Sequence, residues 1–440
     1  MNTRYLERNI DKVLLEWKNS TEHKPLLLRG ARQVGKTSAV RNLGRQFANY
    51  VEIDLHLRKD LHQSFKKMRS PQQLCQEIAL LEGTELTPGK TLLFIDEIQD
   101  CPEAIGCLRY FYEQLPELHV IAAGSLLEFA LEELPSFGVG RIHSLYMYPF
   151  CFNEFLNANG QSALAVAVQN AAPDNPLPDV VHNRLLEYFR AFLIIGGMPA
   201  VVKKYVETGS FLQCQKILGE LIVSYRDDFA KYRRRIPSSR IDAVFMSVAA
   251  QTQGKFMYSK IDGVRTEQAQ AALQTLILAG LVYPVTHTAA NGIPPGAETD
   301  ERYRRMILMD TGLLQRLLNL DLSEIILEDN TNFVNKGSLA EVFVGCEFVK
   351  NMPPDFPAAL YCWHRDKKGS DAEIDYIVQR HNQIIPVEVK SGKTGKMQSL
   401  RIFMSQKNSP YGIRTSLENF CEYQDIKVYP LYAAGKIVGD

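Results

Sequence analysis

Eight consecutive residues, from Gly30 to Thr37, combine the residue types that bind nucleotide phosphates. They read GARQVGKT and fit the pattern G-x-x-x-x-G-K-[ST] at every fixed position. In this pattern backbone N–H groups surround the phosphates, Lys36 reaches the β- and γ-phosphates, and the Thr37 hydroxyl holds Mg²⁺. The sequence therefore predicts a site for ATP and Mg²⁺, whose nucleotide-binding residues are Gly30, Ala31, Arg32, Gln33, Val34, Gly35, Lys36, Thr37 and Ser38.

The segments on either side of this loop have the patterns needed to position it. Residues 25–28 form a short apolar run that is typical of a buried parallel strand, and residues 36–47 carry apolar side chains at helical spacing. Strand, loop and helix thus follow in the order that phosphate binding requires. The alternative is a glycine turn that only joins a strand to a helix, and this context disfavours it.

Two carboxylates, Asp96 and Glu97, directly follow the apolar run 92–95. Such a strand is buried on both faces of a sheet, and its carboxyl end emerges beside the phosphate loop. We therefore expect Asp96 to hold the Mg²⁺ shell and Glu97 to act catalytically, by orienting the water that attacks the γ-phosphate. A carboxylate that caps a helix N-terminus is the alternative role.

Two further polar residues are candidates for the same site. The run 119–123 predicts another strand, which ends at Gly124 and Ser125. Ser125 is expected to hydrogen-bond the γ-phosphate or the attacking water, to cap the following helix, or both. Arg141 opens a predicted strand over residues 141–148 and is a candidate to stabilise transition-state charge, in its own subunit or in a neighbour, although a surface position is favoured.

A second constellation lies near the C-terminus, on two predicted strands joined by a turn within residues 372–390. Glu388 and Lys390 are two apart on one strand and leave the same face, where Asp375 can join them from the other strand. Phosphodiester hydrolysis needs such a carboxylate pair to hold Mg²⁺ and a lysine beside the attacking water. Glu341, in the first turns of a preceding helix, is a further candidate metal ligand. An alternating charged edge strand is the alternative interpretation.

The middle of the chain is predicted to be mostly helical. Three helical pieces followed by a hairpin over residues 281–309 indicate a winged helix. Its role is DNA contact or packing against protein, and the arginines of the wing are Arg302, Arg304 and Arg305. The densest basic run, residues 231–235, is interpreted as a solvated face, with phosphate contact as the alternative.

Composition limits the location and the partners. Lys plus Arg and Asp plus Glu are both 50, so no overall positive field indicates a nucleic-acid partner. The N-terminal residues 1–17 predict an amphipathic helix and no signal peptide, and no apolar run is long enough to cross a bilayer. The eight cysteines show no metal-binding spacing, which favours reduced thiols and a cytoplasmic protein without a membrane partner.

Four segments of the chain resemble the prokaryotic AAA-type ATPases that carry a C-terminal domain of unknown function with a nuclease-like fold. The segments are GARQVGKT (30–37), LLFIDEIQ (92–99), AAGS (122–125) and GRIHSLYMYPFCFNEF (140–155). The resemblance implies an additional strand between the phosphate-loop strand and the strand that ends in Asp-Glu. The C-terminal segment resembles the restriction-endonuclease-like fold, with Asp375, Glu388 and Lys390 on its acidic-x-Lys signature and Glu341 on its helical acid. It departs from that pattern at Ile374, where many members have proline.

The expected fold is α/β, with a P-loop AAA-type ATPase domain (1–155), a helical connector (156–238), a winged-helix domain (239–330) and a restriction-endonuclease-like domain (331–440). The expected function is ATP binding and hydrolysis coupled to nucleic-acid binding or processing, with DNA as a candidate partner. The alternative is a regulatory ATPase switch whose C-terminal domain is a non-catalytic binding or assembly module, with a second copy or another protein as partner. A nucleotide-binding structural protein without turnover is the third hypothesis.

Overall fold

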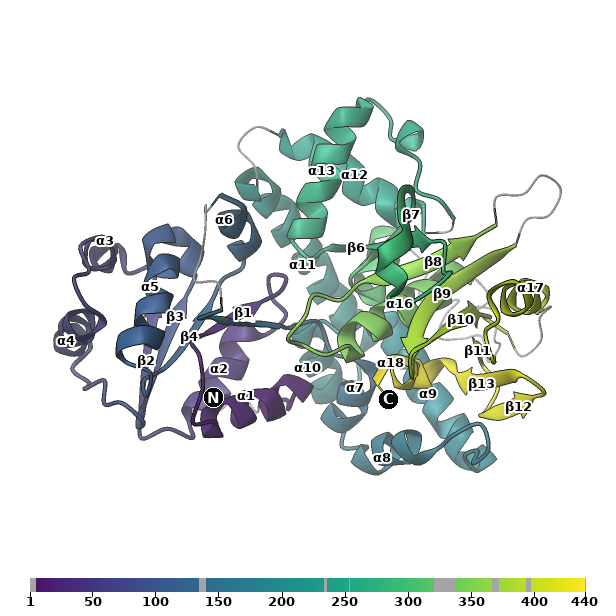
Figure 1. Cartoon of the computed structure of the whole chain (residues 1–440), viewed down its shortest axis with the longest axis horizontal. Helices are drawn as coiled ribbons and strands as arrows, with labels where there is room; N and C mark the ends of the chain where they lie inside the picture. Colours follow the sequence, from purple (N-terminus) through teal and green to yellow (C-terminus); the bar gives the residue numbers. More distant parts are fainter. Residues whose placement is uncertain are drawn as a thin grey trace. The chain divides into compact units, whose positions relative to one another are not determined.

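The computed structural model describes residues 5–133, 140–232, 236–252, 254–319, 337–365, 372–392 and 397–439. Two compact units emerge, and each is continuous in space although not in sequence (Figure 1). The first unit comprises residues 1–148 and 354–357. The second comprises residues 149–353 and 358–440.

The first unit is built on a five-stranded parallel sheet in the order β2-β3-β4-β1-β5. Strand β4 lies between β1, which leads into the phosphate loop, and β3, which ends at Asp96, so the additional strand is where the resemblance implies. The strands are β1 (Leu26–Arg29), β2 (Asn49–Asp54), β3 (Thr91–Asp96), β4 (His119–Ala123) and β5 (His143–Tyr146).

The helices of this unit bury the apolar faces that the sequence predicts. Helix α5 covers one face of the sheet, where Leu108 and Phe111 join a buried cluster with Ile53 and Ile95 (Figure 1). The N-terminal helix is amphipathic, as expected, and buries its apolar stripe. The helices are α1 (Asn9–Asn19), α2 (Lys36–Gly44), α3 (His62–Lys66), α4 (Pro71–Glu82), α5 (Pro102–Gln114) and α6 (Leu127–Glu133), with 3-10 turns η1 (Lys59–Leu61) and η2 (Ile98–Asp100).

The edge strand β5 of this sheet meets a segment from much later in the sequence. The backbone N–H of Tyr146 donates to the Pro354 carbonyl at 2.7 Å. Residues 354–357 therefore belong to the first unit, although they lie in the chain between two elements of the second.

The second unit begins with a helical array. Helices α9 and α10 are joined by a tight turn at Gly196 and Gly197, where a Cβ on Gly197 would lie 2.1 Å from the Phe150 carbonyl oxygen. The helices are α7 (Phe152–Ala158), α8 (Ser162–Asn170), α9 (Asp179–Ile195), α10 (Pro199–Thr208), α11 (Phe211–Tyr232), α12 (Ser238–Ala250), α13 (Thr266–Leu278) and α14 (Thr311–Leu317), with the 3-10 turn η3 (Tyr258–Lys260).

An eight-stranded mixed sheet in the order β12-β13-β11-β10-β9-β8-β6-β7 forms the rest of this unit. Its strands are β6 (Val282–Thr288), β7 (Thr299–Leu308), β8 (Leu360–His364), β9 (Glu373–Arg380), β10 (Gln383–Val389), β11 (Gly412–Ser416), β12 (Cys421–Tyr423) and β13 (Ile426–Pro430). The remaining elements are α16 (Gly337–Asn351), α17 (Gln398–Lys407), α18 (Lys436–Gly439) and the 3-10 turns η4 (Pro295–Glu298) and η5 (Leu431–Ala433).

The hairpin interpreted as a wing is part of this sheet. Strand β6 pairs in parallel with β8, so β6 and β7 extend the sheet that carries the predicted C-terminal site (Figure 1). Of the three wing arginines, Arg302 pairs with Asp300 at 2.9 Å and Arg304 with Glu301 at 3.6 Å. Arg305 is only 3% exposed, and the expectation that it contacts DNA from a wing is therefore wrong.

The basic run 231–235 lies mostly outside the described residues, which end at Tyr232 and resume at Ile236. Lys231 pairs with Asp228 at 2.9 Å. All eight cysteines are free thiols, as expected, and burial raises the pKa of the Cys75 thiol to about 12. Within the described ranges, no helix combines the length and the hydropathy that crossing a bilayer requires.

Candidate functional site

The phosphate loop joins the end of β1 to the start of α2 in a strained backbone path. Gly30, Gln33 and Gly35 have positive φ angles of 134°, 65° and 101°. A Cβ on Gly30 would lie 2.1 Å from the Met147 carbonyl oxygen, so only glycine fits there. Backbone of this kind, at a helix N-terminus, presents successive N–H groups to an anion.

Lys36 lies within this loop and is 7% exposed. Its Nζ donates to the Gly30 carbonyl at 2.8 Å and to the Ala31 carbonyl at 2.9 Å. Burial lowers the pKa of Lys36 to about 8, although the carboxylates of Glu97 and Asp96 act in the opposite direction. Two carbonyl oxygens therefore hold the ammonium in the loop, and phosphate oxygens can replace them as hydrogen-bond acceptors.

We expect ATP binding to take up protons above about pH 8. Phosphate oxygens favour the charged form and raise the pKa of Lys36, so below about pH 8 the lysine is already charged and takes up no proton. Above it, proton uptake rises toward one, and ATP affinity falls by up to about tenfold per pH unit. Calorimetry in two buffers of different ionisation enthalpy, at about pH 7.5 and about pH 9, measures the uptake. Equal uptake at both pH values contradicts the expectation, and Lys12→Met, on the exposed face of α1, is the control.

Thr37 and Asp96 meet beside the loop, where the Thr37 hydroxyl donates to Asp96 Oδ2 at 2.7 Å. Asp96 Oδ1 accepts the Glu97 backbone N–H at 3.0 Å. Burial raises the pKa of Asp96, against the effect of these two hydrogen bonds. A hydroxyl and a carboxylate that converge in this way are the hard oxygen donors that Mg²⁺ prefers, so these residues fit the predicted ion.

Glu97 is held in an uncommon backbone conformation, with φ 48° and ψ 43°. Its Oε2 accepts hydrogen bonds from the Ser125 hydroxyl at 3.0 Å and from Gln99 Nε2 at 2.6 Å. Burial acts to raise the pKa of Glu97, but these hydrogen bonds outweigh burial and lower it. The carboxylate therefore stays charged and fixed, which suits a residue that orients water. Ser125 and Glu97, which the sequence analysis assigned to the same site, are in contact. Gln99 also contacts Glu97, and the sequence pattern did not single it out.

Arg8 supports the phosphate loop from the N-terminus of α1. Its guanidinium donates to the Val34 carbonyl at 3.1 Å and to the Tyr148 carbonyl at 2.7 Å. The side chain is 8% exposed. Sequence reasoning missed this residue, because an arginine at the start of an amphipathic helix carries no signal that it reaches a loop elsewhere in the chain.

Arg141 does not join the phosphate loop within this chain. Because β5 runs parallel to β1, with His143 beside Leu26, Arg141 lies at the edge of the sheet opposite the loop. It forms an ion pair with Glu113 of α5, and its side chain is 48% exposed. The favoured interpretation as a surface arginine agrees with this position, and a role in a neighbouring subunit stays a prediction.

The C-terminal residues that the sequence singled out converge on one face of the large sheet. Val387 pairs with Tyr376, which places Glu388 beside Asp375. Lys390 Nζ contacts Glu388 Oε1 at 2.5 Å, and the Val389 N–H donates to Asp375 Oδ2 at 2.7 Å.

Glu341, on α16, is linked to this cluster by Arg305, a residue that the sequence analysis assigned to the wing. Arg305 Nη1 lies 3.0 Å from Glu341 Oε2 and 3.5 Å from Asp375 Oδ1. Sequence reasoning missed this role, because only the pairing of the β6–β7 hairpin with β8 brings Arg305 to the site.

Burial and mutual repulsion dominate the electrostatics of this cluster. They raise the pKa of Glu341 to about 8 and that of Glu388 to about 7, with the charge on Asp375 adding to burial in both cases. Glu388 Oε2 is buried without a hydrogen-bond partner. Such an orphaned oxygen beside a second carboxylate fits Mg²⁺, which is often held by one or two carboxylates and several waters.

The cluster does not fit an ion held by protein side chains alone. Within the described ranges, no group of three or more His, Cys, Asp or Glu side chains has the geometry to hold a metal ion. The three predicted ligands are therefore not equivalent: Asp375 and Glu388 lie side by side on neighbouring strands, whereas Glu341 comes from α16 and makes the shorter ion pair with Arg305, at 3.0 Å against 3.5 Å for Asp375.

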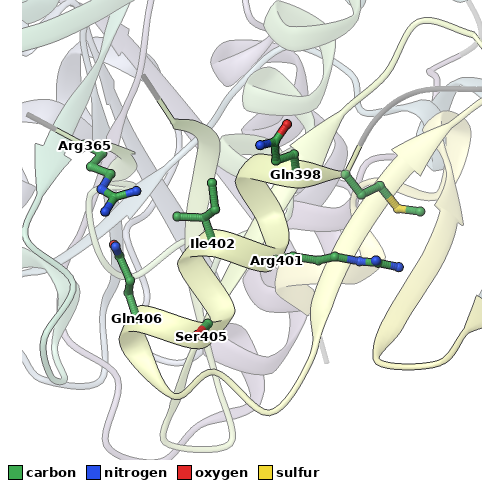
Figure 2. A pocket seen from close by; sticks show the side chains of 7 residues that line it. Arg365, Gln398, Arg401, Ile402, Ser405 and Gln406 are labelled. Atoms are coloured by element: carbon green, nitrogen blue, oxygen red, sulfur yellow. The ribbon is translucent and has the colours of Figure 1, made fainter. Parts of the chain in front are cut away.

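A cavity of about 740 Å³ lies beside α17 in the second unit. Figure 2 shows the polar ends of Arg365 and Gln406 close together on one side and Arg401 extending away from them on the other. Ile374 packs with the α17 residues Leu400 and Phe403, so α17 covers the sheet face opposite to that of Asp375. This cavity is therefore separate from the carboxylate cluster.

Comparison with known proteins identifies the first part of the chain. Residues 22–156 match the model of a family described as an AAA domain. Residues 186–324 and 336–434 each match a model described as a domain of unknown function, DUF8612 and DUF4143 respectively. A search of curated proteins gave no match. Residues 22–156 are therefore similar to an AAA domain.

The solved structures that match this chain do so at low identity and with TM-scores below 0.5. The Walker-type ATPase PABY2304 of Pyrococcus abyssi is 17% identical, with a TM-score of 0.46, over 72% of this chain and 97% of that one. The ORC1 protein of Aeropyrum pernix, solved in complex with DNA, is 13% identical, with a TM-score of 0.28, over 76% of this chain and 91% of that one.

Proposed function

We propose that this chain binds and hydrolyses ATP with Mg²⁺, and that its ATPase cycle controls a metal-dependent nuclease-like site in the second unit. The observation that carries the ATPase part is the meeting of Thr37, Asp96 and Glu97 beside the phosphate loop, with the Thr37 hydroxyl 2.7 Å from Asp96. In P-loop NTPases a Ser or Thr of the loop and an Asp at a strand end hold Mg²⁺, and a further residue orients the attacking water.

Each residue of the first site has a role in this proposal. Backbone N–H groups of the loop and Lys36 bind the phosphates and neutralise their charge. Thr37 and Asp96 would hold Mg²⁺, which would neutralise charge that develops on the phosphate. Glu97, kept charged by Ser125 and Gln99, accepts a hydrogen bond from the attacking water and aligns it with the γ-phosphate.

The proposed nuclease-like role rests on the second constellation. Asp375 and Glu388 would hold a divalent ion, which when bound activates water and polarises the scissile phosphate. Lys390 is the more open cation of the cluster, with 29% of its side chain exposed, and its Nζ is placed to stabilise negative charge that develops at the phosphate. DNA is the proposed substrate, and the winged-helix and restriction-endonuclease-like domains over 239–330 and 331–440 are part of the proposal.

Cleavage of DNA tests this role. With Mg²⁺ or Mn²⁺, we expect the chain to cut supercoiled plasmid or branched DNA, and Lys390→Ala and Glu388→Ala to slow cutting by about 100-fold, because each removes a charge that acts on the reacting phosphate. Gel analysis of nicked and linear products measures the rate. Lys204→Ala, which removes a lysine paired with Glu207 on α10, is the matched control. If the chain cuts none of these DNA substrates with Mg²⁺ or Mn²⁺, the nuclease-like role is refuted.

The second candidate function is a regulatory ATPase switch whose C-terminal site binds or assembles without cutting. The ion pairs of Arg305 with Glu341 and Asp375 favour it, because they occupy carboxylates that a metal centre would use. This candidate predicts an oligomeric state that changes between ATP and ADP, measured by light scattering, and the same change in Lys390→Ala and Glu388→Ala.

A further inference from the structure

The buried guanidinium of Arg305 is the least expected feature of the carboxylate cluster. We infer that Arg305 is a built-in cation that takes the place of a second metal ion, so that the cluster binds a single divalent ion through Asp375 and Glu388. The inference rests on the proposed nuclease-like function of this site. It makes Arg305 a positioning residue that fixes Glu341 and sets the number of ions bound.

Arg305 is anchored from several directions at once. Its Nη1 contacts carboxylate oxygens of Glu341 and Asp375, at 3.0 Å and 3.5 Å, and its Nη2 donates to the backbone carbonyl of Asp375. The guanidinium lies over the Tyr376 ring, 5.4 Å from its centroid. The Tyr376 hydroxyl in turn donates to the Glu341 carbonyl at 2.7 Å. A side chain with these contacts and 4% exposure cannot leave without breaking all of them.

The buried carboxylate oxygen that stays open to an ion belongs to Glu388. Glu341 Oε2 accepts the Arg305 hydrogen bond, and Asp375 Oδ2 accepts the Val389 N–H. Glu388 Oε1 contacts Lys390, whereas Glu388 Oε2 is buried and has no hydrogen-bond partner. An ion bound by Glu388 Oε2, the neighbouring Asp375 carboxylate and water does not require Glu341 as a ligand.

The charges of the cluster agree with one ion. Four carboxylates lie on the elements that meet here; Arg305 pairs with Glu341 and Asp375, and Lys390 pairs with Glu388. When all four carboxylates are ionised, two negative charges are left over, which one divalent ion balances. A second ion would add two positive charges beside a buried guanidinium that cannot lose its proton, which is unfavourable. The carboxylates are Glu341, Glu373, Asp375 and Glu388.

Binding of Mn²⁺ to the full chain tests the inference without relying on activity. The background variant Asp96→Asn, without nucleotide, removes the carboxylate of the ATPase site, and electron paramagnetic resonance measures free Mn²⁺. We expect one bound ion. Glu388→Gln should weaken its binding by at least about tenfold, as loss of a ligand does. Glu341→Gln should change the affinity by less than about twofold, because Arg305 and not the metal holds that carboxylate.

Variants of Arg305 complete the test. Arg305→Gln is expected to bind two ions, the second of which is lost when Glu341→Gln is added, and Arg305→Lys, which keeps the charge, is expected to bind one. Three results would overturn the inference but not the proposed function. They are an equal weakening of Mn²⁺ binding by Glu341→Gln and Glu388→Gln, two bound ions in the background variant, and one bound ion in an Arg305→Gln variant that folds. If Arg305→Gln does not fold, the Glu341→Gln result decides. If no bound Mn²⁺ is lost in Glu388→Gln, both the proposed nuclease-like function and the inference are overturned.

Discussion

We expect Glu97→Gln to lower the kcat of ATP hydrolysis by about 10²–10⁴-fold, the range that loss of a general base produces, and to leave ATP binding intact. Glutamine keeps the size of the side chain, but its amide cannot take a proton from water. The hydrogen bonds that fix the Glu97 carboxylate are donated by Gln99 and by the hydroxyl and backbone N–H of Ser125, and the amide oxygen of glutamine can still accept them. The backbone turn should therefore persist, and the loss isolates the carboxylate charge.

Phosphate release and the binding of a fluorescent ATP analogue are the two measurements. Glu103→Gln, which alters a half-exposed carboxylate near the start of α5, is the matched control and should hydrolyse ATP at the wild-type rate. Full hydrolysis by Glu97→Gln would show that another group orients the water. Lack of hydrolysis by the wild type as well would favour the third hypothesis, a nucleotide-binding protein without turnover.

Asp310→Ala destabilises the second unit by about 2–5 kcal/mol, the sum of a lost helix cap and an unpaired buried N–H group. Asp310 is fully buried, caps α14 by accepting the Leu313 N–H at 3.1 Å, and accepts the Gly197 N–H at 2.6 Å. A Cβ on Gly196 would lie 2.1 Å from Asp310 Oδ1, so the α9–α10 turn is shaped around this carboxylate. Alanine removes both acceptors, and water cannot readily replace them.

The two tryptophans of the chain allow each unit to be followed separately. Trp17 lies in the first unit, and the buried Trp363 lies in the second. In a Trp17→Phe background, urea unfolding followed by Trp363 fluorescence should shift to lower urea with Asp310→Ala. Asp310→Asn keeps one acceptor oxygen and should shift it less. In a Trp363→Phe background, the Trp17 transition should stay in place, and an equal shift there would contradict a local role for Asp310.

Local patterns predicted the elements and the residues of the first site. Residues 30–37 and 92–97 each combine an apolar run with a fixed chemical motif, and parallel strands bring their carboxyl ends to one edge of a sheet. The hydrogen bond between Thr37 and Asp96 follows from that rule. The same holds for Asp375 and Glu388, because a hairpin with a short turn fixes its own register.

Long-range contacts account for what the sequence did not predict. The parallel pairing of β6 with β8 joins residues 75 positions apart, such as Val285 and Leu360, and no turn chemistry encodes it. Arg305 was assigned to the wing for that reason, although the pairing buries it beside Glu341. Arg8 and Arg141 show the same limit: the alternation and spacing that predict an element do not say which distant loop or helix a long side chain will reach.

The segment 354–357 has a consequence for how the protein is made. The Pro354 carbonyl accepts the Tyr146 N–H on edge strand β5, so the ATPase sheet obtains one of its edge contacts from a residue synthesised some two hundred positions later. The chain passes between the two units after residues 148, 353 and 357. On the ribosome the first unit therefore cannot be completed before most of the second unit has emerged. A chain that ends at residue 148 would lack this contact.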